Sequence, residues 1–204
     1  ERPISTVQSS AIYVAQMRDY LPDYIGGVLW FGNDDANMVA LTPVYSCLES
    51  VPECYSSKLA NATQFSFRNA FWMCNWVSNM VYPRYSQMFP TLREVRDSLE
   101  NSYFAQQKSV EDEALTLYNK DKAAALKYLN DYSNTQAQNM LATWRELATF
   151  LIVKYNDMVV KPTEGRTFLR TKTGLGARVK REGYPEQFAR QFVKTTGTKF
   201  QSPE

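Results

Sequence analysis

The sequence predicts an α+β protein, because its first 45 residues have strand composition and residues 65–160 have the apolar periodicity of helices. Residues 161–204 differ from both parts, with several glycines and a local excess of basic side chains. We therefore divide the chain into a β-rich segment (1–60), a helical region (61–160) and a basic, loop-rich return segment (161–204).

The β-rich segment predicts one strand followed by a hairpin. The strand covers 10–18, with residues 12, 14 and 16 on one face and residues 13, 15 and 17 on the other. Polar and apolar residues do not alternate cleanly there, which predicts that both faces are covered. The hairpin covers 27–42, with turn residues Gly32-Asn33-Asp34-Asp35 and a return strand from Met38 to Leu41.

Residues 65–160 predict a series of helices separated by proline and capping signals. The first runs from Phe65 to Tyr82 and is closed by Pro83. Capping boxes at 91–94 and 133–136 predict two helix starts, and further helices begin near Ser109 and Asp121. The longest helix has an apolar stripe typical of packing surface, formed by Ala137, Leu141, Trp144, Ala148, Leu151, Tyr155 and Met158.

The return segment is basic, with nine Lys or Arg against four acids between residues 164 and 204, a net charge of +5. One short helix is predicted near Pro185 to Val193. Gly174-Leu175-Gly176 lacks the residues of a phosphate-binding loop, and the whole chain has a net charge of only +2. A solvated surface is therefore favoured over a nucleic-acid site, and no apolar stretch predicts a membrane-spanning helix.

The chain has no histidine and three cysteines, Cys47, Cys54 and Cys74. The missing histidine excludes Ser-His-Asp and Cys-His catalysis within the chain. No cysteine pair has metal-binding spacing, and we expect neither metal nor cofactor. Cys47 and Cys54 are either a bridged pair or two free thiols, and the aromatic neighbours of Cys74 indicate a buried small hydrophobe.

Several blocks of sequence occur in an order that resembles one enzyme family. They are Arg2-Pro3-Ile4-Ser5, the block from Gln16 to Trp30, Thr42-Pro43-Val44-Tyr45, the block from Asn75 to Tyr85, the Trp144 helix and Gly183-Tyr184-Pro185. Together they resemble the C-terminal half of the PepD-like dipeptidases, cysteine peptidases of the N-terminal-nucleophile class. The resemblance implies part of an αββα sandwich and hydrolysis of dipeptides without metal.

The same resemblance implies that the attacking cysteine lies on an N-terminal segment outside this chain, since residue 1 is Glu1. In this class the α-amine of the nucleophile is the general base, so no histidine is required. The candidates for oxyanion or substrate contacts are Arg18 and Arg2, with Asn33 a weaker choice. A structural ion pair is the commoner role for each arginine.

The expected partners are a short peptide substrate, the segment that carries the nucleophile and, in some assemblies, a second copy of the chain. A fragment of a sandwich should expose an apolar sheet face or edge within its first 45 residues. Two other functions fit the sequence: a non-catalytic helical interaction module, and an amidase or acyltransferase on the same scaffold.

Overall fold

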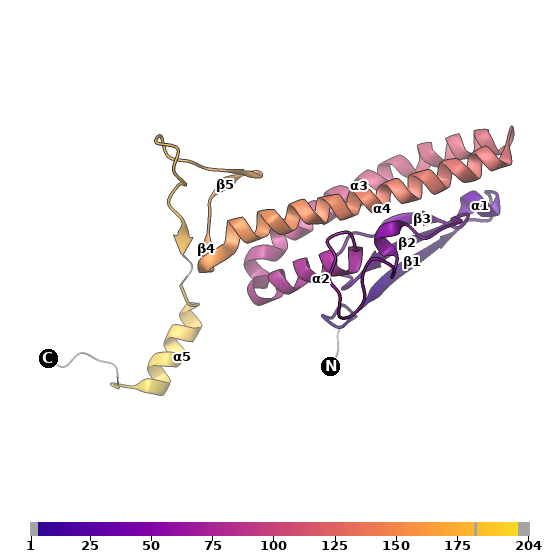
Figure 1. The fold of residues 1–204 in the computed structure, drawn as a ribbon. Helices are drawn as coiled ribbons and strands as arrows, with labels where there is room; N and C mark the ends of the chain where they lie inside the picture. Colours follow the sequence, from indigo (N-terminus) through magenta and orange to yellow (C-terminus); the bar gives the residue numbers. More distant parts are fainter. Residues whose placement is uncertain (1–3, 182, 200–204) are drawn as a thin grey trace. The chain divides into compact units, whose positions relative to one another are not determined.

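The computed structural model describes residues 4–181 and 183–199, which belong to two compact units divided between Ile152 and Val153. The first unit contains a three-stranded antiparallel sheet and the main helices (Figure 1). The second unit contains the rest of the chain. The mixture of helices and antiparallel strands confirms the predicted α+β class.

The sheet has the order β1-β2-β3 and is formed by β1 (Ala11–Met17), β2 (Gly27–Asn33) and β3 (Thr42–Tyr45). A single helical turn, α1 (Asp23–Gly26), joins β1 to β2. The predicted first strand is confirmed, and β2 and β3 pair as an antiparallel hairpin. The predicted bounds of this hairpin are wrong, because residues 38–41 belong to the connection and the return strand is Thr42–Tyr45.

The two faces of the sheet have different surroundings. One face of the sheet carries Val28 and Trp30, which are two residues apart on β2, together with their cross-strand partners Tyr45 and Val14. This face packs on the long helices, since Val28, Trp30 and Tyr45 belong to the core shared with them. On the opposite face Tyr13 is 67% exposed and Met17 is 76% exposed. The prediction that both faces of this strand are covered is wrong for this chain, and the expected exposed apolar face is present.

A shorter helix, α2 (Ala70–Val81), follows a loop that contains the 3₁₀ turn η1 (Glu53–Tyr55). The helix begins later than predicted because Asn69 is its N-cap, with its side chain accepting a hydrogen bond from the Trp72 amide at 3.2 Å. The predicted end is confirmed, since a second 3₁₀ turn, η2 (Tyr82–Arg84), contains Pro83.

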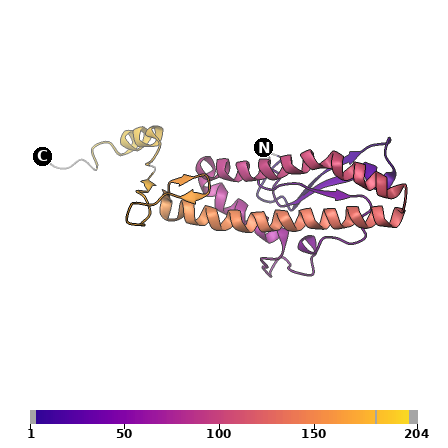
Figure 2. The same cartoon turned by 90° about the horizontal axis from the view of Figure 1, so that it is seen from above.

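Two long helices, α3 (Tyr85–Tyr118) and α4 (Lys122–Tyr155), form an antiparallel pair of 34 residues each (Figure 2). The four helices predicted for this region are thus merged into two. Pro90 is the sixth residue of α3, and it removes one backbone hydrogen bond near the start of the helix. The capping-box residue Ser133 is buried in α4, where its hydroxyl accepts a hydrogen bond from the Tyr45 amide at 3.2 Å.

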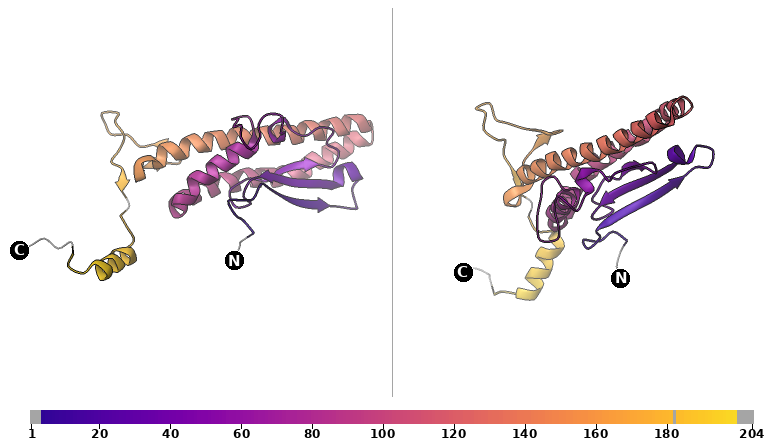
Figure 3. Two further views of the ribbon diagram at one scale, coloured as in Figure 1. Left: turned by 60° about the horizontal axis from the view of Figure 1, so that its bottom comes forward. Right: turned by 45° about the vertical axis from the view of Figure 1, so that its right-hand side comes forward.

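Tertiary packing explains why the local stop signals fail. Most helical stability in proteins comes from an apolar face buried along the helix, which outweighs individual capping residues. The shared core contains residues from the sheet, from α3 and from α4, among them Val28, Tyr103 and Leu129. Figure 3 shows the sheet on one side of the helix pair.

The apolar stripe predicted on α4 is buried from Ala137 to Tyr155, which confirms its packing role. Its predicted last member, Met158, is 70% exposed. The helix ends at Tyr155, and Asp157 and Met158 have φ values of 57° and 58°, so the chain leaves the helical direction before Met158. No described helix is long and apolar enough to cross a lipid bilayer.

The second unit has little regular structure. Its elements are η3 (Asn156–Met158), the strand pair β4 (Val159–Val160) and β7 (Lys180–Arg181), the hairpin β5 (Thr163–Glu164) and β6 (Thr167–Phe168), and α5 (Glu186–Thr196). The short C-terminal helix was predicted correctly. Phe188 and Phe192 of α5 are stacked, and Tyr184, which precedes the helix, is stacked on Phe188.

Candidate functional site

Arg18, a predicted substrate contact, follows β1 directly and is engaged by protein groups. Its Nη1 donates to Glu111 Oε1 at 2.6 Å, and its Nε and Nη2 donate to the carbonyl oxygens of Gly26 and Ile25, each at 3.2 Å. The side chains of Arg18 and Glu111 are only 10% and 11% exposed. This geometry is that of a structural ion pair, and a substrate role for Arg18 stays a prediction.

Glu111 is the centre of this polar network. Its Oε1 also accepts hydrogen bonds from the Tyr45 hydroxyl at 3.2 Å and from Gln107 Nε2 at 3.0 Å. Burial, together with the neighbouring Glu111 carboxylate, raises the pKa of Tyr45, so its hydroxyl stays protonated and donates. The helix start predicted near Ser109 is wrong, because α3 continues through this position, and Glu111 in the middle of the long helix is buried.

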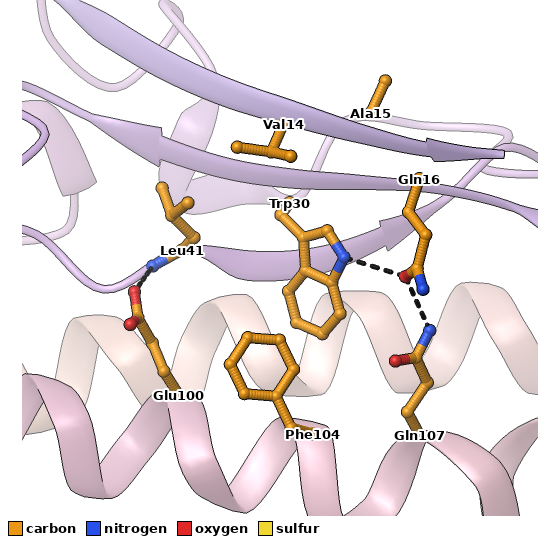
Figure 4. A pocket seen from close by; sticks show the side chains of 8 residues that line it. All are labelled: Val14, Ala15, Gln16, Trp30, Leu41, Glu100, Phe104 and Gln107. Carbon is orange, nitrogen blue, oxygen red and sulfur yellow. Dashed lines mark hydrogen bonds between the residues drawn. The ribbon is translucent and has the colours of Figure 1, made fainter.

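A cavity of about 400 Å³ lies next to this network, between the edge of the sheet and α3 (Figure 4). Its apolar walls are Val14, Trp30, Leu41 and Phe104, and we call it the Trp30 cavity. The Trp30 and Phe104 rings lie with their centroids 4.8 Å apart and their planes inclined by 52°.

Two polar groups mark the ends of the Trp30 cavity (Figure 4). At one end, Gln16 Oε1 accepts hydrogen bonds from Trp30 Nε1 at 3.1 Å and from Gln107 Nε2 at 2.8 Å. At the other end, Glu100 Oε1 accepts from the Leu41 amide at 2.9 Å. Burial raises the pKa of the Glu100 carboxyl.

A second cavity, of about 360 Å³, lies where the β1–β2 pair meets the start of α2. It is lined by Asn33 with Tyr55, Asn61, Asn69 and Trp72, and we call it the Asn33 cavity. Asn33 and Trp30 are three residues apart on β2, so their side chains point to opposite faces of the sheet. The side-chain amide of Asn33 makes no hydrogen bond within the described part of the chain, and it is therefore available to a ligand.

The position of Asn33 depends on a buried turn. Asp34, the next residue, has a φ of 81°, which non-glycine residues seldom adopt. Its carboxylate accepts hydrogen bonds from Asn75 Nδ2 at 2.8 Å and Ser78 Oγ at 2.7 Å, both on α2. Burial raises the pKa of Asp34. The turn role predicted for Asp34 and Asp35 is consistent with this geometry, but the burial of both residues and the bonds of Asp34 to α2 were not predicted.

All three cysteines are buried free thiols. Burial raises the pKa of each of them, to about 12 for Cys54. A reactive cysteine requires an accessible thiolate, so none of these thiols has the environment of a nucleophile.

Of the two arginines of the predicted site, Arg2 lies outside the described residues. Arg18 points into the network at the opposite end of β1 from Asn33. Gln16, Gln107 and Glu100 were not predicted as site residues. Their separation in sequence hides their proximity, since Gln16 and Gln107 are 91 positions apart.

Among known protein families, residues 1–98 fit the family model of peptidase family C69. No curated protein matches the chain. The match is consistent with the resemblance to PepD-like peptidases and relates these residues to a family of cysteine peptidases. All residues that line the Asn33 cavity lie within the matched range, whereas Glu100, Phe104 and Gln107 of the Trp30 cavity lie beyond it.

Proposed function

From the relationship of residues 1–98 to a family of cysteine peptidases, we propose that the chain is the C-terminal part of a dipeptidase. Its nucleophile is a cysteine at the start of an N-terminal segment outside these 204 residues. The observation that carries this proposal is the state of Cys47, Cys54 and Cys74, which are all buried and have raised pKa values. A cysteine peptidase whose own thiols are unreactive requires a sulfur from elsewhere.

The exposed sheet face supports a docking place for that segment. Tyr13 and Met17 are large apolar side chains on a strand that is also the edge of the sheet. Apolar sheet faces of this kind are normally covered by another layer of structure. We propose that the N-terminal segment supplies a second sheet over this face, which gives the sandwich that the family resemblance implies.

The proposed substrate is a short peptide bound in the Asn33 cavity. The cavity is next to the proposed docking face, because Asn33 pairs with Ala11 at the end of β1. The free amide of Asn33 is a suitable donor to the carbonyl oxygen of a scissile peptide bond. The absence of histidine from the chain fits a mechanism in which the α-amine of the nucleophile accepts the proton.

Alkylation of the complete gene product tests the position of the nucleophile. We expect iodoacetamide at neutral pH to label one thiol, to abolish dipeptide hydrolysis, and to leave Cys47, Cys54 and Cys74 unmodified in a peptide map. The 204-residue chain alone should neither react nor hydrolyse dipeptides. Labelling of one of the three internal cysteines in parallel with loss of activity would contradict the proposal.

Substitution of Asn33 tests the substrate site. In the complete protein, Asn33→Ala should lower kcat/KM for a dipeptide by about a hundredfold, because an oxyanion or carbonyl donor is lost. Asn101→Ala, which removes an exposed amide on α3, is the matched control and should leave kcat/KM unchanged. Equal values for wild type and Asn33→Ala, with both proteins folded, would exclude Asn33 from the site.

A further inference from the structure

We propose that the Trp30 cavity binds a small organic amine, with its apolar body against Trp30 and Phe104 and its ammonium group paired with Glu100. This site is separate from the proposed peptide site, because Trp30 and Asn33 lie on opposite faces of β2. It also includes residues of α3 beyond the range that matches the peptidase family. The proposal therefore does not depend on peptidase activity.

The shape and walls of the cavity favour a single apolar ring. A volume of about 400 Å³ is at the small end of the range for ligand pockets. Trp30 from the sheet and Phe104 from the helix present two aromatic rings to the same space (Figure 4). Aromatic rings bind apolar groups and also attract cations to their faces.

Glu100 determines the sign of the charge that the cavity accepts. One carboxylate oxygen is used by the Leu41 amide, and the other has no hydrogen-bond partner among the described residues. No lysine or arginine contributes to the described lining. The nearest cation along α3, Arg96, favours the charged form of Glu100 from a distance, but its hydrogen bonds go to Asp97 and to the carbonyl oxygen of Asn37. Burial still raises the pKa of Glu100, and an ammonium group in direct contact offsets the cost of burying this carboxylate.

At the opposite end of the cavity the polar side chains are uncharged, and hydrogen bonds fix their positions. Gln16 is fixed by its hydrogen bonds with Trp30 and Gln107, and Gln107 is fixed in turn by Glu111. The remaining amide groups of these glutamines provide hydrogen bonds but no charge. The site thus complements a monoamine and disfavours an anion of the same shape.

Calorimetric titration of the 204-residue chain with three matched probes tests this proposal. The probes are 2-phenylethylamine, the neutral 2-phenylethanol and the anionic 3-phenylpropionate. We expect the amine to bind about tenfold more tightly than the alcohol, which corresponds to one charge-assisted contact, and the anion to bind more weakly than either. Equal affinities for the amine and the alcohol, or binding of neither, would overturn the proposal.

Substitutions distinguish a direct contact between the amine and Glu100 from the general effect of negative charges on the same helix. Glu100→Gln keeps an acceptor for the Leu41 amide and should bring the amine and the alcohol to within about twofold of each other. Glu94→Gln changes an exposed acid earlier on the same helix and should keep the tenfold preference. Phe104→Ala, at a side chain that is 55% exposed, should fold normally and weaken both ligands to the same extent. Equal loss of the amine preference in Glu94→Gln and Glu100→Gln would also reject the site.

Discussion

Replacing Trp144 by alanine will lower the free energy of unfolding by about 3–5 kcal/mol, the range for a large aromatic side chain removed from a core. Trp144 is fully buried in the middle of α4, on the stripe that packs this helix. Alanine keeps the helix propensity high, so the expected loss comes from the cavity and from lost apolar contact. Urea or guanidinium unfolding followed by circular dichroism measures the change.

Two further substitutions test the reason for this effect. Glu146→Ala changes an exposed position two residues away and should alter the stability by less than about 0.5 kcal/mol. Trp144→Phe should lose much less than Trp144→Ala, because the indole Nε1 has no hydrogen-bond partner among the described residues. Phenylalanine removes that unsatisfied donor while it keeps a ring in the core. A loss below 1 kcal/mol for Trp144→Ala would show that α4 does not depend on this contact.

Replacing Glu111 by alanine should lower the free energy of unfolding about as much as replacing Trp144, because the Arg18 guanidinium is then buried without its anion. The expected loss for Glu111→Ala is about 3–5 kcal/mol, the range for breaking a buried ion pair from one side. The Tyr45 hydroxyl and the Gln107 amide lose the same acceptor. Chemical unfolding again gives the measurement.

A double-mutant cycle separates the ion pair from its surroundings. Arg18→Met combined with Glu111→Ala should destabilise the protein by less than the sum of the two single changes, since neither charge is then left alone. Glu113→Ala removes an exposed acid two residues further along α3 and serves as the control. Additive effects in the cycle would contradict a direct coupling between Arg18 and Glu111.

The sequence predicted local structure well wherever the signal was local. The strand at 10–18, the existence of the hairpin, the C-terminal helix and the apolar stripe on α4 follow from residue patterns over short windows. The breaks at Pro90 and Ser133 were mispredicted because each is a local stop signal that burial of the long helices overrides. Ser133 bonds to the Tyr45 amide, 88 positions away, which no local pattern reveals.

The site was less predictable for the same reason. Glu111 looks like part of an acidic helix start, and only its partner Arg18, 93 positions away, shows its role. Asn33 was proposed as a contact, and the structure leaves its amide free beside a cavity. Glu100, in contrast, has no motif around it, because its significance comes from the aromatic walls that the fold places next to it.

The glutamine and arginine bonds at the end of β1 also determine how this strand aligns with its neighbour. A shift of one residue would exchange the two faces of β1, and burial alone opposes such a slip weakly here, since much of the strand is exposed. In the shifted alignment Gln16 would leave Trp30 and Gln107, and Arg18 would leave Glu111. Four directed polar side chains thus select one pairing for a strand whose hydrophobic pattern is ambiguous.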